Sequence, residues 1–363
     1  MTMELFGNEH KADIDGIARV KVIGVGGGGC NAVNRMYRER VPHVEYLAVN
    51  TDAQHLVRLD VPVKIRIGDT ITRGLGVGGD PEIGRTAAEE SREEIYESVR
   101  GADMLFIASG MGGGTGTGAA PVVAEVARET GALTIAVVTK PFRFEGRRRG
   151  KNADDGLARL REAVDTLIVV PNDRLGAMCD EDLSAEDAFK LADDVLRLGV
   201  KSIAELVTVP GEINLDFADV KTIMSGAGPA WMSIGSAHGD NRSVEAAKSA
   251  IHSPMLDVNI EGARGVLLNI TGGPNMTLKE VQRAADVIAN SVDPDANIIF
   301  GMVTDPKMED EMCVTIIATG LPSIEQMSLN DDGIAEFLRR AISDETDFDL
   351  PPFLRPSNRQ ATA

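Results

Sequence analysis

Short apolar segments that alternate with longer helical patterns are the feature that most limits how this chain can fold. Strands buried on both faces, with helical patterns between them, indicate a parallel sheet with crossover helices. The sequence therefore predicts an α/β fold, in which the carboxyl ends of the strands share one edge of the sheet. The five segments read as strands are Arg19–Gly26, Val44–Asn50, Ala102–Gly110, Leu133–Lys140 and Thr166–Asp173.

The helical patterns begin and end at recognisable residues. Pro81 lies early in one segment and Gly101 just past its end, so a single helix is expected between them. A longer helix is expected over Ala185–Val207, about 34 Å long at 1.5 Å per residue. Ser184, with an acidic residue three positions on, resembles a capping box at its start.

Changes in composition and in the pattern of predicted elements divide the chain into domains. Beyond Pro210, three more strand patterns and a helical pattern predict a smaller α/β unit. After Gly320 the chain is polar and acidic, which is typical of a mostly disordered tail. We therefore expect an N-terminal extension (1–18), a Rossmann-like ligand-binding domain (19–183), a central helix (184–209), a C-terminal domain (210–320), a linker (321–346) and a terminal peptide (347–363).

Glycine-rich loops follow two of the predicted strands. Gly24, Gly26 and Gly29 fit G-x-G-x-x-G between a strand and a helix, where free N–H groups and the helix dipole favour phosphate. Gly110–Gly118 (GMGGGTGTG) has the same context, and Arg73–Pro81 supplies a third glycine segment. A tight turn or a flexible linker would explain one such loop. Three along one sheet edge favour a polyphosphate ligand.

Composition excludes several classes of function. The chain has 363 residues, 37 Lys plus Arg against 56 Asp plus Glu, and a net charge of -19, which disfavours nucleic acid and anionic lipid as partners. Its three cysteines show no metal-binding spacing and suggest a reducing compartment. No signal peptide or membrane-spanning run is found, so we expect a cytoplasmic protein with no direct membrane insertion.

Two nucleotide-binding classes can be weighed against these loops. No G-x-x-x-x-G-K-[ST] is present, so this is not a Walker-type NTPase. An NAD-dependent Rossmann oxidoreductase would account for the first loop, with Asp52 on the ribose. That alternative leaves Gly110–Gly118 unexplained and offers no convincing hydride-transfer residues.

Six segments in unbroken order resemble the loops of the tubulin/FtsZ family of GTPases, whose bacterial members act in cell division. They are GGGGCN, NTDAQ, GLGVGGDP, GMGGGTGTG, PFRFEGRRR and NLDFADV, between about Arg19 and Gly320. The resemblance implies a GTP-binding domain, a central helix and a smaller activation domain. It also implies GTP hydrolysis to GDP and head-to-tail filaments that form the division ring at midcell.

The resemblance also implies which residues contact the nucleotide. Glu145 and Arg149 match ribose and nucleotide contacts, although the neighbouring arginines read equally well as a solvated run. Phe189 matches a surface on which the base stacks and Asp193 its reader, because a carboxylate accepts from the guanine N–H groups. Asp194 is an alternative reader, and periodicity alone would assign Phe189 to the core. The matching loop residues are Gly27, Gly28, Gly29, Cys30, Asn31, Gly114, Thr115 and Gly116.

Hydrolysis is assigned through the same resemblance. Asp216, Asp219 and Asn214 match a loop that meets the nucleotide of the next subunit and orients the attacking water. From the residues alone, the two aspartates read as a helix start. Mg²⁺ would be held mainly by phosphates and water, with no dedicated protein ligands. A regulatory relative that binds GTP but hydrolyses it poorly is disfavoured by both aspartates.

The tail carries one short apolar motif, Asp347–Pro356. It resembles the family's C-terminal peptide, which binds membrane-tethering division proteins, and it would order on contact. An inert end is the alternative. The segment Leu321–Thr346 is shorter and more helical in pattern than a long unstructured linker.

Overall fold

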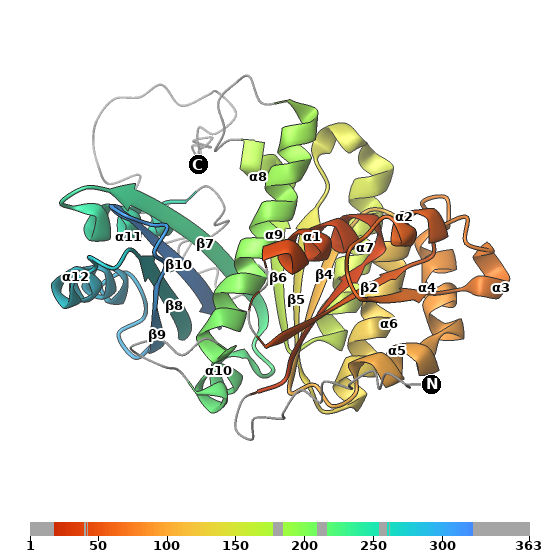
Figure 1. Ribbon diagram of the computed structural model, residues 1–363, viewed down its shortest axis with the longest axis horizontal. Helices are drawn as coiled ribbons and strands as arrows, with labels where there is room; N and C mark the ends of the chain where they lie inside the picture. The colour runs from red at the N-terminus through yellow and green to blue at the C-terminus, as the bar shows by residue number, and fades with distance from the viewer. Residues whose placement is uncertain are drawn as a thin grey trace, which may run out of the picture. The chain divides into compact units, whose positions relative to one another are not determined.

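The computed structural model describes residues 18–39, 41, 43–176, 184–208, 216–253, 260 and 262–321. Their strands form a ten-stranded sheet in the order β3-β2-β1-β4-β5-β6-β7-β10-β8-β9 (Figure 1). The expected N-terminal extension, apart from residue 18, and the linker and terminal peptide beyond residue 321 lie outside the described residues.

The N-terminal strands are parallel, as the sequence predicts, and all five expected segments are strands. β1 lies between β2 and β4, so the order from β3 to β6 is that of a doubly wound dinucleotide-binding fold. A short sixth strand, β3, extends the edge. The bounds are β1 Val20–Val25, β2 Val44–Asn50, β3 Val63–Arg66, β4 Met104–Gly110, β5 Leu133–Lys140 and β6 Thr166–Pro171.

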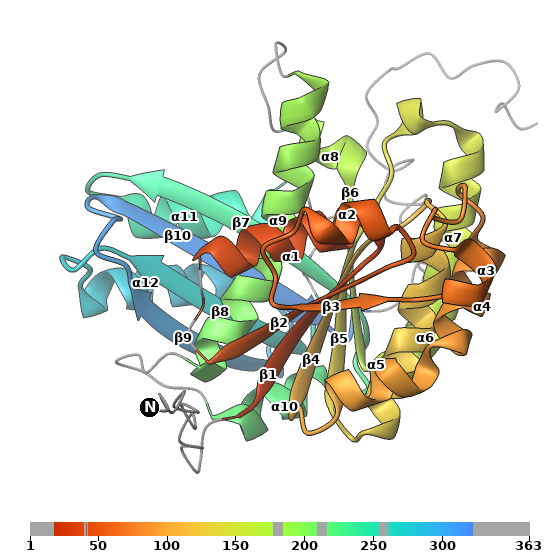
Figure 2. The same ribbon diagram turned by 45° about the vertical axis from the view of Figure 1, so that its right-hand side comes forward.

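Helices cover both faces of this sheet (Figures 1 and 2). Buried residues of α1 and α9 share one apolar core with one face. Buried residues of α4 to α7 share a second core with the opposite face. The helix bounds are α1 Gly26–Glu39, α2 Ala53–Val57, α3 Asp69–Thr72, α4 Pro81–Glu90, α5 Arg92–Val99, α6 Thr115–Glu129, α7 Arg147–Ala163 and α8 Asn172–Gly176, with the 3-10 turn η1 at Arg143–Glu145.

One helix expected between Pro81 and Gly101 is two helices, α4 and α5, which meet at Ser91. Ser91 leaves helical geometry at φ -104 and ψ 19, and its hydroxyl accepts a hydrogen bond from the Gly68 N–H at 3.1 Å. Serine competes for backbone groups in this way, which disfavours it inside helices. The long-range contact at Gly68 therefore accounts for the break.

The long central helix is confirmed. α9 runs over Ala185–Thr208, 24 residues or about 36 Å. The expected cap at Ser184 is also present, because its hydroxyl accepts from the Asp187 N–H at 3.1 Å. The residues that α9 buries include Ala192, Val195, Leu196, Val200 and Ile203.

The C-terminal domain continues the same sheet. β7 (Gly228–His238) pairs with β6 over only three residue pairs, beginning at Thr166↔Gly228. Beyond it β10 runs antiparallel between β7 and β8. Three of these four strands were expected from the sequence, whereas β7 and the helix after it were not. The remaining elements are α10 Phe217–Met224, α11 Arg242–Ile251, β8 Gly265–Gly272, α12 Leu278–Ala289, β9 Asn297–Thr304 and β10 Glu311–Thr319.

Candidate nucleotide site

The two glycine loops meet where the strand order changes direction. β1 and β4 are neighbours in register, with Val25 opposite Ser109, and each is followed by a helix. α1 begins at Gly26 and α6 begins at Thr115. The Ser109 hydroxyl ties the two strand ends together by donating to the Val25 carbonyl at 3.1 Å. Two helix N-termini at a topological switch point form an anion-binding edge.

Some of the glycines are needed because backbones approach closely. A Cβ at Gly29 would lie 2.1 Å from the Ala108 carbonyl oxygen in β4. One at Gly26, where φ is +72°, would lie 2.6 Å from the Gly116 nitrogen. These glycines allow the first loop to pack against β4 and the start of α6.

Other glycines in the same loops have open space beside them. A Cβ on Gly27 or Gly113 would meet no heavy atom within 4 Å, and one on Gly28 would come no nearer than 3.5 Å. Open space beside free backbone N–H groups is what a phosphate needs to approach them. The geometry therefore separates Gly27 and Gly28, which border this space, from Gly29, which packs.

The third glycine segment lies against the second loop, as the sequence suggested. A Cβ at Gly114 would lie 2.2 Å from Val77 and 2.9 Å from the Asp80 nitrogen. A Cβ at Gly118 would lie 1.9 Å from the Pro81 carbonyl oxygen. The start of α4 is thereby packed directly on the start of α6.

Threonine hydroxyls order the second loop from within. Thr115 and Thr51 share a hydrogen bond between their hydroxyls at 2.7 Å, and both residues are buried. The Thr117 hydroxyl accepts from the Gly112 N–H at 2.8 Å. Thr115 therefore links the phosphate loop to the end of β2, and its side chain already has a partner.

The Cys30 side chain points into the core. Its thiol donates to the Gly24 and Val49 carbonyls, each at 3.4 Å. Burial raises the pKa of this thiol to about 12, so it is not a thiolate at neutral pH. A nucleotide contact at Cys30 would therefore have to use the backbone.

Asn31, in the second turn of α1, has an exposed side chain with one described partner. Its Oδ1 lies 2.9 Å from His55 Nε2, on α2. His55 Nδ1 in turn lies 3.1 Å from the Asn50 side-chain nitrogen at the end of β2. The histidine therefore connects the first loop to the neighbouring strand.

Phe189 lies near the start of α9, with 43% of its surface exposed. Its ring contacts Phe142 and Phe144 edge-on, with centroids 5.5 and 6.3 Å apart, and these two rings stack on each other at 4.9 Å. Phe189 is thus a partly exposed aromatic surface and not a core residue, which is the geometry that stacking on a base requires.

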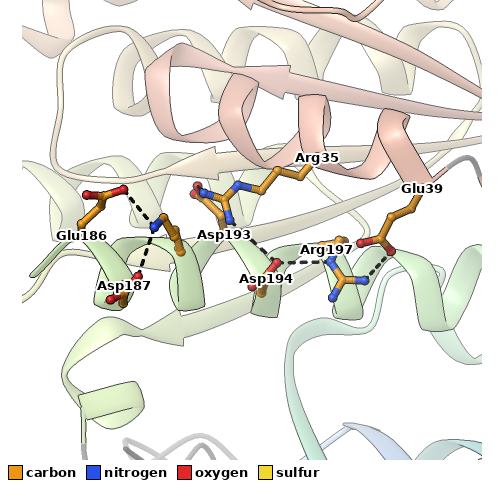
Figure 3. A network of polar contacts seen from close by, with 8 residues as sticks. Arg35, Glu39, Glu186, Asp187, Asp193, Asp194 and Arg197 are labelled. Atoms are coloured by element: carbon orange, nitrogen blue, oxygen red, sulfur yellow. Dashed lines mark hydrogen bonds and ion pairs between the residues drawn. The ribbon is translucent and has the colours of Figure 1, made fainter. Parts of the chain in front are cut away.

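Asp193 and Asp194 belong to one network of ion pairs, in which Arg35 lies 3.6 Å from Asp193 and 4.0 Å from Asp194 (Figure 3), but their exposure differs. The Asp193 side chain is 17% exposed and lies 3.6 Å from the Arg35 guanidinium of α1. Burial raises the pKa of Asp193 to about 6 even though Arg35 acts to lower it. Asp194 is 41% exposed and pairs with Arg197 at 3.3 Å. The partly desolvated Asp193 is the better acceptor for a buried ligand.

Glu145, the last residue of η1, and Arg149, in the first turn of α7, form an ion pair across Gly146. Glu145 also accepts from the Phe142 N–H at 2.9 Å and is nearly buried, whereas Arg149 is half exposed. The pair lies beside the phenylalanine cluster, because Phe142 donates its N–H to Glu145 and its ring contacts Phe144 and Phe189. Its free oxygen lone pairs and exposed guanidinium remain available to a ligand.

Asn172 was not singled out from the sequence. It directly follows β6 and is buried, yet its Oδ1 has no hydrogen-bond partner within the described residues. Buried polar atoms normally have partners, so an unpartnered acceptor at this edge marks a second candidate for reading a ligand. Its position could have indicated this role from the sequence, because Asn172 is a polar residue at the carboxyl end of a predicted parallel strand.

Asp216 and Asp219 lie at the opposite edge of the sheet. Asp216 is the N-cap of α10, and its side chain accepts from the Asp219 N–H at 2.8 Å. The far end of α10 contacts the start of β6, because the Thr166 hydroxyl donates to the Met224 carbonyl at 2.5 Å. The structure therefore does not bring these aspartates together with the glycine loops of the same chain. Asn214 lies outside the described residues.

Comparisons with known proteins show the family of the chain. Residues 19–180 match the GTPase domain of the tubulin/FtsZ family, and residues 228–322 match the C-terminal domain of the FtsZ family. A solved FtsZ dimer from M. jannaschii, described as empty, is 46% identical over 84% of this chain and 88% of its own, with a TM-score of 0.81.

A second, mutant FtsZ structure from M. jannaschii is 45% identical over 84% of this chain and 92% of its own, with a TM-score of 0.82. CetZ2 from Haloferax volcanii, solved as a GTPγS-bound protofilament, is 22% identical over 90% of this chain and 100% of its own. Its TM-score is 0.71, which at this identity shows a shared fold alone.

Proposed function

The chain belongs to the tubulin/FtsZ family of GTPases, and on that premise we propose that it assembles head to tail into filaments that form the cell-division ring. As a family member it is a cytoskeletal protein that binds GTP or GDP and hydrolyses GTP. These matches do not support the alternative of an NAD-dependent oxidoreductase. We propose that the GTP-binding domain spans residues 19–183, the central helix 184–209 and the C-terminal domain 210–320.

The phosphates of GTP bind between the starts of α1 and α6. Backbone N–H groups around Gly27 and Gly28 face open space, and those of Gly114 to Gly116 begin the second helix. Two helix dipoles then favour the same polyphosphate. Asn31 adds a side-chain contact, while Gly29 and Cys30 contribute backbone alone.

The nucleoside extends toward the start of α9. Phe189 stacks on the base, and Glu145 with Arg149 contacts the ribose. Asp193, ionised at neutral pH, accepts hydrogen bonds from the pairing edge of guanine. Asn172 supplies a further acceptor there.

Magnesium would reach this site through the nucleotide. Within the described residues, no group of three or more His, Cys, Asp or Glu side chains could hold a metal ion. Mg²⁺ commonly binds substrate phosphates and keeps several waters, so phosphate oxygens would supply its principal ligands. When bound, it would neutralise charge on the transferred phosphoryl group.

The opposite placement of Asp216 and the glycine loops is the observation that carries this proposal. One strand length of six to eight residues, about 20–26 Å, separates the two edges. A single chain cannot bring Asp216 and Asp219 to its own γ-phosphate. A second chain that docks its α10 edge onto the nucleotide edge of the first can place both aspartates, with Asn214, beside the attacking water.

Such a contact joins two different surfaces of identical chains. Heterologous contacts that do not close into a ring produce open filaments. The FtsZ dimer supports self-association, and the CetZ2 protofilament is a filament formed by a chain of the same fold.

The place in the cell where filaments assemble would be set by the C-terminal peptide. Within the described residues, no helix has the length and apolarity to cross a membrane. We propose that Asp347–Pro356, outside the described residues, binds membrane-tethering division proteins and holds cytoplasmic filaments at the inner face of the membrane at midcell.

A dilution series of GTP hydrolysis with Mg²⁺ tests the shared site. The rate per protein molecule should fall to zero below a threshold concentration, because isolated chains lack Asp216 at their nucleotide. GTP binding, measured separately, should persist below that threshold. A constant rate per molecule on dilution would overturn the shared site, and a rate near zero at every concentration would favour the poorly hydrolysing alternative.

A further inference from the structure

His55 lies between two asparagine side chains, and its neighbours define which ring nitrogen carries the proton. Asn50 Oδ1 accepts from the Thr51 N–H at 2.9 Å, which turns the Asn50 side-chain nitrogen toward His55. That nitrogen lies 3.1 Å from His55 Nδ1. Because an amide nitrogen only donates, Nδ1 must accept and cannot carry a proton.

The remaining proton of the neutral ring is then on Nε2. This nitrogen lies 2.9 Å from Asn31 Oδ1, so the ring donates and the Asn31 carbonyl accepts. The Asn31 amide is thereby oriented, and its NH₂ group donates to no atom of the described residues. Among the described residues, both N–H donors of Asn31 are thus left for a ligand beside the second turn of α1.

We infer that His55 is a positioning residue for the nucleotide, which orients the Asn31 amide so that its NH₂ group faces an anionic ligand. The inference rests on the proposed function, in which Asn31 contacts GTP. Without His55 the amide could rotate and present its carbonyl oxygen, which would repel phosphate oxygens. The relay runs from Asn50 through His55 to Asn31, so it links the end of β2 to the first glycine loop.

Protonation of His55 would break this relay. An imidazolium donates at both nitrogens, so Nδ1–H would face the donating Asn50 nitrogen. Burial lowers the pKa of His55 and Arg58 adds to that effect, while Asp52 opposes it. α1 and β2 present the neutral Asn31 and Asn50 to the ring. The relay is therefore intact at neutral pH and is lost only as the pH falls below the usual range of histidine.

A double-mutant cycle on GTP affinity tests the relay in the full-length chain. Asn31→Ala should weaken binding about tenfold, and His55→Leu about fivefold. If His55 acts through Asn31, adding His55→Leu to Asn31→Ala should produce no further loss. Additive losses would overturn the inference.

His55→Gln is the matched control. Glutamine has an acceptor and a donor at similar reach, so it should retain affinity within about twofold and confirm that the relay, not ring packing, is needed. The ratio of wild-type to His55→Gln affinity should be highest where His55 is neutral and should fall as the solution becomes more acidic than the usual range of histidine. A ratio that is flat throughout, or a glutamine variant as weak as leucine, contradicts the relay.

Nitrogen NMR of the five histidines reads the tautomer of His55 directly. The ring whose signals are absent in His55→Gln should be wholly in the Nε2–H tautomer at neutral pH, without the minor Nδ1–H population of a free imidazole. An Nδ1–H tautomer at His55 would overturn the inference. Full GTP affinity in His55→Leu would also overturn it but leave the nucleotide site standing, whereas no GTP binding by the unmodified chain would overturn the proposed function itself.

Discussion

Neighbouring glycines of the first loop differ in what surrounds them. Gly29→Ala should lower the free energy of unfolding by about 3 kcal/mol, because its Cβ would lie 2.1 Å from the Ala108 carbonyl. Gly27→Ala is the matched control and should leave that free energy unchanged to within about 1 kcal/mol, since its Cβ meets open space. Urea unfolding measures both. Gly27→Ala should instead weaken GTP binding, and equal stability losses at the two positions would contradict this division.

Asp193 should make GTP affinity depend on pH near 6. The carboxylate with a pKa of about 6 is mostly ionised at pH 7.5 and mostly protonated at pH 5, so GTP affinity should fall as the pH is lowered across that interval.

The stability of the nucleotide-free protein should depend on pH in the opposite direction. The folded state holds its proton more tightly than the unfolded state, so the free energy of unfolding should decrease as the pH rises from 3.8 to about 6. Calorimetric titration at each pH would measure the GTP affinity, and urea unfolding would measure the free energy of unfolding.

Exchanging the carboxylate for an amide tests which aspartate reads the base. Asp193→Asn should weaken GTP binding at least tenfold, because a charge-assisted acceptor is lost. It should bind xanthosine triphosphate better than the wild type does, since an amide N–H can donate to the extra carbonyl of xanthine. Asp194→Asn, the control, should change neither affinity. The reverse pattern would make Asp194 the reader.

At the scale of elements, α10 gives Asp216 a structural role beside its proposed catalytic one. Asp216→Ala removes the N-cap and should lower the free energy of unfolding by about 1 kcal/mol. Asp216→Asn keeps a capping oxygen and should leave stability nearly unchanged. Both should abolish GTP hydrolysis and retain GTP binding. An asparagine variant with normal hydrolysis would show that GTP hydrolysis needs the capping oxygen of residue 216 and not its negative charge.

At the scale of the whole molecule, two inactive variants should restore each other. Asp216→Asn chains keep the nucleotide loops, and chains carrying a base-site substitution such as Asp193→Ala keep the α10 edge. In a mixed filament, one of the four ordered contact types pairs an intact nucleotide site with an intact Asp216. Hydrolysis measured on the mixture should therefore exceed the sum of the separate rates. No recovery in filaments shown to contain both variants would contradict a site completed by the next subunit.

Much of the fold and part of the site could be predicted from sequence because the deciding signals are local. Strand and helix periodicity identified five N-terminal strands and α9, and glycine between a strand and a helix marked the phosphate edge. β7 was missed because its sequence, GPAWMSIGSAH, is interrupted by glycine and serine and is held by long-range pairing with β10. The break at Ser91 likewise depends on the distant Gly68.

By itself, the sequence determined the five parallel N-terminal strands, the central helix and the edge at which an anion binds, since these follow from periodicity and from the directions of strands and helix dipoles. The tertiary structure alone decided how chemically equivalent residues differ: Gly29 packs while Gly27 faces open space, and the side chain of Asp193 is largely buried while that of Asp194 is exposed. It also placed Asp216 across the sheet from the phosphate loops. Burial and distance depend on segments far apart in the chain, so local patterns do not contain them.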